Sequence, residues 1–223
     1  VGALISALSI IPAFFIGRKV GGNVGGFFTA WAVAVNSFFL SRTAGESSDT
    51  DSYNILFPLL IIWIFFEALD AESLRKRITL FILTGVAVGL YAFAWTGWWF
   101  IFYFMLTTLI LVWIQNTALA FSQEKTFSSS LSTLWSLGLD FAALFSSSLF
   151  FTFLFAGFEE FEKAIRGPFG VFALKAVGTT KIWPNVLTTV AELNPSSLDS
   201  VIGQLGGTFI FVLCILGIIL VAF

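Results

Sequence analysis

Histidine is absent from this chain, and cysteine and charged residues are scarce. Without histidine, any metal site must be built from oxygen ligands. The single cysteine, Cys214, forms no intramolecular disulfide and matches no metal-binding spacing. Charged residues make up 11% of the sequence, against about a quarter in soluble domains. No basic cluster is large enough to follow a phosphate backbone, so we expect no nucleic-acid partner.

Hydrophobic residues, in contrast, make up 58% of the 223 residues. A globule of this size cannot hide so much apolar surface, so lipid must cover much of it. Because lipid-exposed backbone must satisfy its own hydrogen bonds, we predict an all-α fold, a polytopic transmembrane helix bundle. Seven apolar segments cross or nearly cross the bilayer: 3–16, 25–40, 53–69, 78–95, 98–114, 131–156 and 201–223.

Basic residues lie in alternate connections between these segments. Arg18-Lys19, Arg75-Lys76-Arg77 and Lys125 follow the first, third and fifth segments. The positive-inside rule makes their side cytoplasmic, so the loops 41–52 and 157–200 face outward. Four segments separate these two loops, an even number, so the loops share a side whichever way the protein is oriented.

The loop 41–52 carries two carboxylates, Asp49 and Asp51, two residues apart and close to Arg42. An Asp-x-Asp turn can point both carboxylates at one hard divalent cation. Arg42 would complement a phosphate, since its planar donors stay charged. The pattern equally fits a solvated acidic turn in which Asp51 caps a helix that begins at Tyr53.

The long loop 157–200 is unusual for a compact domain, and such loops are often functional. Its apolar stretch 182–193 contains a single carboxylate, Glu192. The alternative is a surface loop whose Glu192 faces water. Upstream, the charged residues between Glu159 and Arg166 are typical of a solvated interfacial helix end.

Two carboxylates lie within the apolar segments. Glu67 is close to Arg75-Lys76-Arg77 and is expected to reach the cytoplasmic interface. Asp140 lies deeper, among serines. An intramembrane acid suggests a functional site, but a hydrogen bond that packs two helices fits Asp140 equally well.

Neither end of the chain has the features of a natural terminus. The sequence begins at Val1 without an initiator methionine or a charged leader, and it stops inside the apolar run 209–223. We therefore expect a fragment, in which residues 1–223 form part of a transmembrane domain.

Several motifs resemble the catalytic subunit of oligosaccharyltransferases, most closely its archaeal, AglB-type form. The block Ser-Arg-Thr-Ala-Gly at 41–45, followed by Asp-Thr-Asp at 49–51, is similar to the family's second outer-loop motif. The Trp-Thr-Gly-Trp-Trp element at 95–99 also resembles an element of that family. Thr-Val-Ala-Glu at 189–192 resembles the motif of its long fifth outer loop. The resemblance implies a GT-C-type glycosyltransferase membrane domain.

The resemblance also implies roles for individual residues. Asp49 binds a metal ion, Mn²⁺ or Mg²⁺, and helps to polarise the acceptor amide. Asp51 completes or supports the metal site, and Glu192 reaches the metal and the acceptor from the long loop. Arg42 contacts the lipid-linked phosphate or orients the acidic cluster. Thr189 lies where the loop touches the acceptor peptide.

The implied reaction is the en bloc transfer of an oligosaccharide from a lipid-linked donor to Asn of an Asn-x-Ser/Thr sequence in an acceptor polypeptide. The family's first outer-loop aspartate and its C-terminal soluble domain with a Trp-Trp-Asp sequence are missing, so we expect the fragment alone to be inactive. Two alternatives stay open: another membrane glycosyltransferase that uses a polyprenyl-phosphate sugar, and a cation transporter with Asp140 and Glu67 on its path.

Overall fold

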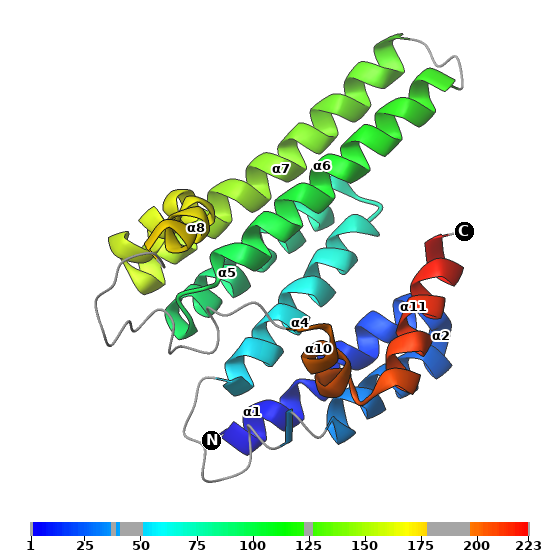
Figure 1. Ribbon diagram of the computed structural model, residues 1–223. Coiled ribbons are helices and arrows are strands. Elements are labelled where there is room, and N and C mark those ends of the chain that lie inside the picture. The colour runs from blue at the N-terminus through cyan, green and yellow to red at the C-terminus, as the bar shows by residue number, and fades with distance from the viewer. Residues whose placement is uncertain (1, 37–38, 41–50, 123–126, 178–196, 223) are drawn as a thin grey trace. The chain divides into compact units, whose positions relative to one another are not determined.

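The computed structural model describes residues 2–36, 39–40, 51–122, 127–177 and 197–222 (Figure 1). Within these ranges the chain is helical between short connections and contains no strand, so the predicted all-α fold is confirmed. Five helical stretches there are long and apolar enough to cross a membrane, or six if the bent C-terminal pair counts as one span. The chain divides into two compact units, 1–52 with 169–223, and 53–168.

The first predicted pair of segments forms a helical hairpin. After the short α1 (Gly2–Leu8), α2 (Ile10–Val35) leaves helical geometry at Gly21 and Gly22, and Gly22 has a φ of 64°. The two halves of α2 then pack closely, since a Cβ added to Gly17 would lie 2.6 Å from the carbonyl oxygen of Gly25. The structure therefore joins the segments 3–16 and 25–40 within one long stretch, because two glycines reverse the chain.

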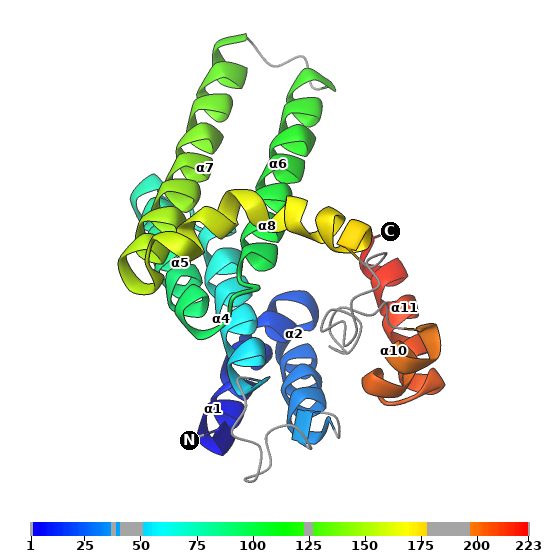
Figure 2. The same cartoon turned by 60° about the vertical axis from the view of Figure 1, so that its left-hand side comes forward.

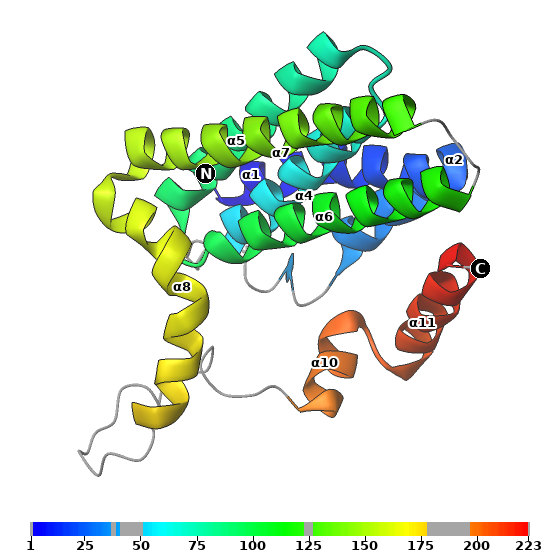
Figure 3. The ribbon, with the colours of Figure 1, turned by 90° about the horizontal axis from the view of Figure 1, so that it is seen from above.

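The C-terminal segment is also broken. Helices α10 (Leu198–Leu205) and α11 (Thr208–Ala222) are bent by about 90° relative to each other. Figure 3 shows the bend between them. Gly206 and Gly207 both have positive φ, at 105° and 100°, a conformation that other residues rarely adopt. The single segment predicted at 201–223 is therefore two helices.

The unit 53–168 contains four long helices that match the predicted segments. They are α4 (Asp51–Leu69), α5 (Leu74–Ala94), α6 (Trp99–Ser122) and α7 (Phe127–Ala156). Phe65 of α4 packs its ring against Phe81 of α5, with centroids 5.8 Å apart. Continuous apolar runs bounded by polar or aromatic residues were enough to predict these spans.

Helices α5 and α7 pack along a stripe of small residues. A Cβ on Gly85 would lie 2.1 Å from the Ser147 hydroxyl, and a Cβ on Gly89 would lie 2.6 Å from the backbone of Phe151. The two glycines are four residues apart, which places them on one face of α5. Small residues at this spacing allow two transmembrane helices to approach closely.

The stretch 157–200, predicted as a loop, begins with a helix. Helix α8 (Phe158–Val177) follows α7 after Gly157, whose φ is 86°. Figure 2 shows the first part of α8, residues 158–168, running across the start of α6 and the end of α7 instead of along them. The sequence prediction missed most of this helix, because its charged and glycine-containing sequence lacks the continuous apolar character of the spans.

Candidate functional site

The predicted site residues lie almost entirely outside the described part of the chain. Arg42 and Asp49 fall within 41–50, and Thr189 and Glu192 fall within 178–196. Asp51 is the first residue of α4, and only its backbone is described. Across the described ranges, no group of three or more His, Cys, Asp or Glu side chains could hold a metal ion. The metal site that we predict from Asp49, Asp51 and Glu192 therefore stays a prediction.

Ser52, which directly follows the Asp-x-Asp motif, is held in place by a buried hydroxyl pair. Ser52 is buried, and its Oγ is hydrogen-bonded to the Oγ of Ser6 on α1, 3.2 Å away. A Cβ on Gly2 would lie 3.3 Å from the same Ser52 Oγ. The backbone at the end of the motif is thus fixed against α1.

Aromatic rings join the start of α4 to the end of α5. The Tyr91 hydroxyl donates a hydrogen bond to Asn54 Oδ1 at 3.4 Å. The ring of Tyr91 lies 5.8 Å from that of Phe57 and 5.7 Å from that of Trp95, and Tyr53 stacks on Phe57. Tyr91 is almost completely buried. This aromatic ladder fixes the first two turns of α4 against the last turn of α5.

The connection between α5 and α6 is a tight turn, as the sequence predicts. The Trp95 amide still donates to the Tyr91 carbonyl at 2.9 Å, and the Trp98 amide donates to the Trp95 carbonyl at 3.3 Å. A Cβ on Gly97 would lie 2.2 Å from the Trp95 ring. A larger residue at position 97 would therefore require the Trp95 ring to shift.

Trp98 connects this turn to α8. Its side chain is fully buried, and its indole Nε1 donates to Glu160 Oε2 at 3.2 Å. The other carboxylate oxygen of Glu160 lies 2.6 Å from Lys163 Nζ. The sequence prediction placed Glu160 on a solvated helix end, but the structure gives it a tryptophan partner from another helix. The i, i+3 spacing of Glu160 and Lys163 signals their pairing, whereas nothing in the sequence signals the contact with Trp98.

These contacts bring four chain segments to one end of the unit 53–168. They are the start of α4, the end of α5, the start of α6 and the start of α8. The loop 41–52 ends here, and the stretch 157–200 begins here. Which side of the membrane this end faces stays a prediction from the positions of the basic residues.

The intramembrane carboxylates lie on α4 and α7. Asp140 on α7 is bound to Arg77, in the first turn of α5, and the guanidinium also donates to Ser136 Oγ. This favours the helix-packing interpretation of Asp140 over a separate functional site. Glu67 accepts a hydrogen bond from Trp63 Nε1 at 3.3 Å on its own helix, α4.

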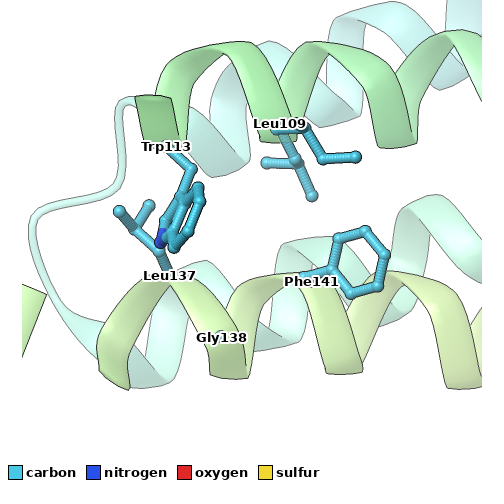
Figure 4. Close-up of a pocket in the computed structure, with 6 residues that line it drawn as sticks. Leu109, Trp113, Leu137, Gly138 and Phe141 are labelled. Atoms are coloured by element: carbon cyan, nitrogen blue, oxygen red, sulfur yellow. The ribbon is translucent and has the colours of Figure 1, made fainter. Parts of the chain in front are cut away.

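A pocket of about 220 Å³ lies between α6 and α7 (Figure 4). Its wall is formed by apolar side chains of α6 and by the α7 surface around Gly138. The lining residues are Leu109, Ile110, Trp113, Leu137, Gly138 and Phe141. None of them carries a titratable or metal-binding group, so these residues could contact an apolar ligand but could not catalyse a reaction.

Residues 1–222 match the family model described as "Oligosaccharyl transferase STT3, N-terminal". The chain belongs to this family. The family resemblance predicted from the sequence motifs is confirmed, and the helix bundle is that of an STT3-type membrane domain.

Two curated proteins are similar to this STT3-type chain. One is the "Dolichyl-phosphooligosaccharide-protein glycotransferase" of Methanococcus voltae, 28% identical over the whole chain. The other is the "Dolichyl-monophosphooligosaccharide--protein glycotransferase AglB" of Haloferax volcanii, 27% identical over 42% of the chain. The aligned regions span 26% and 10% of these relatives' own lengths. No solved structure matches the chain.

Proposed function

We propose that this chain is part of the membrane domain of an oligosaccharyltransferase that transfers a lipid-linked oligosaccharide en bloc to Asn of Asn-x-Ser/Thr sequences. The family match over residues 1–222 carries this proposal. The names of both relatives describe protein glycotransferases with dolichyl-linked donors. The protein would then lie in the cell membrane, with its catalytic loops on the extracytoplasmic side.

The predicted donor set suits a hard divalent cation. Asp49, Asp51 and Glu192 supply carboxylate oxygens, the ligand type that Mg²⁺ and Mn²⁺ prefer. The chain contains no histidine that could compete for the role. These carboxylates would hold Mn²⁺ or Mg²⁺, which would supply positive charge to neutralise the charge that develops on the leaving phosphate.

The chain's own residues then act on the acceptor amide and the donor phosphate. The amide nitrogen of Asn is a poor nucleophile because its lone pair is delocalised. Asp49 and Glu192 accept hydrogen bonds from its N–H groups, which raises the electron density on nitrogen as it attacks the anomeric carbon. One of these two carboxylates takes the N–H proton that the nitrogen loses as the carbon–nitrogen bond forms. Arg42 donates to the phosphate as the carbon–oxygen bond of the donor breaks.

The order of the motifs supports a site built from two loops. Asp49 and Asp51 precede α4, while Thr189 and Glu192 follow α8. The start of α4 and the start of α8 are linked through Tyr91, Trp95 and Trp98 at one end of their unit. A site assembled from both loops would hold donor and acceptor together and exclude water that would hydrolyse the donor.

The full-length protein in membranes tests this proposal. Asp49→Asn and Glu192→Gln should each reduce glycopeptide formation by at least about a hundredfold, because each removes a charge from the reacting centre. Glu72→Gln is the matched control, since this carboxylate lies in the connection between α4 and α5 and is exposed. It should leave the rate unchanged.

A lipid-linked donor with a labelled glycan distinguishes this function from the alternatives, because each predicts a different labelled product. An oligosaccharyltransferase moves the whole labelled glycan onto an Asn-x-Thr peptide. Another polyprenyl-phosphate-dependent glycosyltransferase would leave the peptide unlabelled and transfer the sugar to a different acceptor. Normal glycopeptide formation by Asp49→Asn or by Glu192→Gln would remove the substituted residue from the proposed site.

A further inference from the structure

The first part of α8, residues 158–168, has one side that packs against α6. Glu160 accepts a hydrogen bond from Trp98, and the Ala164 carbonyl accepts one from the Tyr103 hydroxyl at 2.7 Å. A Cβ on Gly167 would lie 2.7 Å from the Trp99 ring, so glycine permits a close approach there. These contacts fix the rotation of α8 about its own axis.

The two remaining sides of this helix differ sharply in chemistry. One side presents apolar side chains: Phe158 is 64% exposed, Ile165 is 62% exposed, and Phe161 stacks on Phe158 with centroids 5.9 Å apart. The other side presents Glu159, Glu162 and Arg166, as expected from the helical repeat. The side chain of Arg166 is 75% exposed and lies 2.8 Å from the Glu162 carboxylate.

The apolar side of α8 adjoins the lipid-facing surface of α7. The Phe161 ring lies 6.2 Å from the Phe153 ring, at an angle of 82°. Phe153 belongs to the membrane span Trp135–Ala156 and is itself 53% exposed. An apolar surface therefore continues from the span of α7 onto α8.

The contacts with α6 orient the two sides relative to the membrane. Trp98 lies just before the span Trp99–Leu119, and Tyr103 lies about 7 Å further into it at 1.5 Å per residue. Trp98 contacts Glu160, which is paired with Lys163 next to the charged side. The deeper Tyr103 contacts Ala164, next to the apolar side. The apolar side thus points toward the bilayer interior and the charged side away from it.

From this geometry we propose that residues 158–168 lie in the plane of the membrane surface as a lipid-binding helix. Phe158, Phe161 and Ile165 are buried among the acyl chains, while the charged side faces water and the lipid headgroups. A helix with one apolar and one charged flank binds at this interface through its buried apolar area. Trp98 and Trp99, at the start of the α6 span, fit the aromatic belt of a membrane interface. The proposal concerns a lipid surface and does not depend on the proposed transferase activity.

Spin labels on the full-length protein in liposomes test the proposal. Single labels are attached through Phe158→Cys and Ile165→Cys on the apolar side, and Glu159→Cys and Arg166→Cys on the charged side. The background lacks native cysteines, Cys214 included. Collisions with oxygen, which concentrates in acyl chains, are compared with collisions with a nickel chelate, which stays in water. Phe153→Cys serves as the lipid reference and Glu72→Cys as the water reference.

We expect oxygen to dominate at positions 158 and 165, as at 153, and the nickel chelate to dominate at 159 and 166, as at 72. The logarithm of the ratio of the oxygen collision rate to the nickel-chelate collision rate should change sign between the two sides of the helix. Nickel access at 158 and 165 would show that the apolar side faces water and would overturn the proposal. Protection of these two positions from both reagents would mean that another part of the protein covers them, and would also overturn it.

Discussion

Arg77 on α5 and Asp140 on α7 form an ion pair, with Arg77 Nε 2.9 Å from an Asp140 carboxylate oxygen. Asp140 is 2% exposed, and the same guanidinium donates to Ser136 one turn earlier on α7. The pair lies in the first turn of α5, before the close contacts at Gly85 and Gly89. It therefore fixes the register of α5 against α7 at one end of their contact.

Asp140→Ala should destabilise the helix bundle, because it leaves the Arg77 charge without its buried partner. We expect a loss of about 3 kcal/mol in the free energy of unfolding, measured by thermal or denaturant unfolding in detergent. Glu162→Ala is the control, since its partner Arg166 is largely exposed and such pairs contribute little. Equal stability of the two variants would contradict the structural role of Asp140.

Removing both charges of this pair gives a second test of its contribution to the free energy of unfolding. Arg77→Met combined with Asp140→Leu should recover much of the stability lost in Asp140→Ala, because no buried charge is left alone. A double variant as unstable as the single one would show that the pair does more than pack α5 against α7.

Gly89→Ala should also destabilise the bundle, because the added methyl group would lie 2.6 Å from the Phe151 backbone. Helices α5 and α7 must then move apart, with an expected loss of about 1–3 kcal/mol. Gly138→Ala on α7 is the matched control, since a Cβ there meets nothing within 4 Å. That variant should be neutral or more stable by up to about 1 kcal/mol, since alanine favours helix. Similar unfolding temperatures for the two variants would count against the close packing of α5 and α7.

Glu160→Ala should loosen α8 from α6, because Trp98 Nε1 loses its acceptor and Lys163 its partner. We expect faster hydrogen exchange across residues 158–168, measured by mass spectrometry, with little change in α5. Trp98→Phe removes the same hydrogen bond but also reduces a fully buried ring, so it should destabilise the packing around α5 and α6 as well as α8. Glu159→Ala, one residue earlier, serves as the control. Unchanged exchange in Glu160→Ala would mean that the hydrogen bond does not anchor α8.

Removal of divalent cations from the full-length protein should abolish glycopeptide formation, and Mn²⁺ or Mg²⁺ should restore it. If Asp51 supports the metal site, Asp51→Asn should raise the half-saturating Mn²⁺ concentration by about 10–100-fold. Glycopeptide formation at saturating Mn²⁺ should fall less than in Asp49→Asn. Full activity in the presence of excess chelator would remove the metal from the proposed mechanism.

The sequence was sufficient to predict the spans because their signal is local. The apolar runs that became α4, α5, α6 and α7 are continuous, and Gly97 between tryptophans indicates a tight turn. The ion pair of Arg77 with Asp140 could not be predicted, because its members are 63 residues apart and no local pattern relates them.

Other features escaped prediction because their sequence patterns were ambiguous. Helix α8 mixes charged, aromatic and glycine residues, so hydropathy alone suggested a loop. The break at Gly206 and Gly207 lies inside an apolar run, where glycine is common in spanning helices as well. For the site itself, the motifs predict Arg42, Asp49, Asp51, Thr189 and Glu192, while the structure describes only the helices that flank them.

The number of residues in the tight turn around Gly97 affects how α6 is positioned relative to α8. Trp95 packs over Gly97 in this turn, so an extra residue would disrupt that contact. One inserted residue would rotate the start of α6 and carry the Trp98 indole away from Glu160. The four-residue connection from Asp70 to Ser73, on the other side of α5, makes no such contact with α8 in the described structure. The length of this turn thus determines the depth in the membrane at which residues 158–168 of α8 lie.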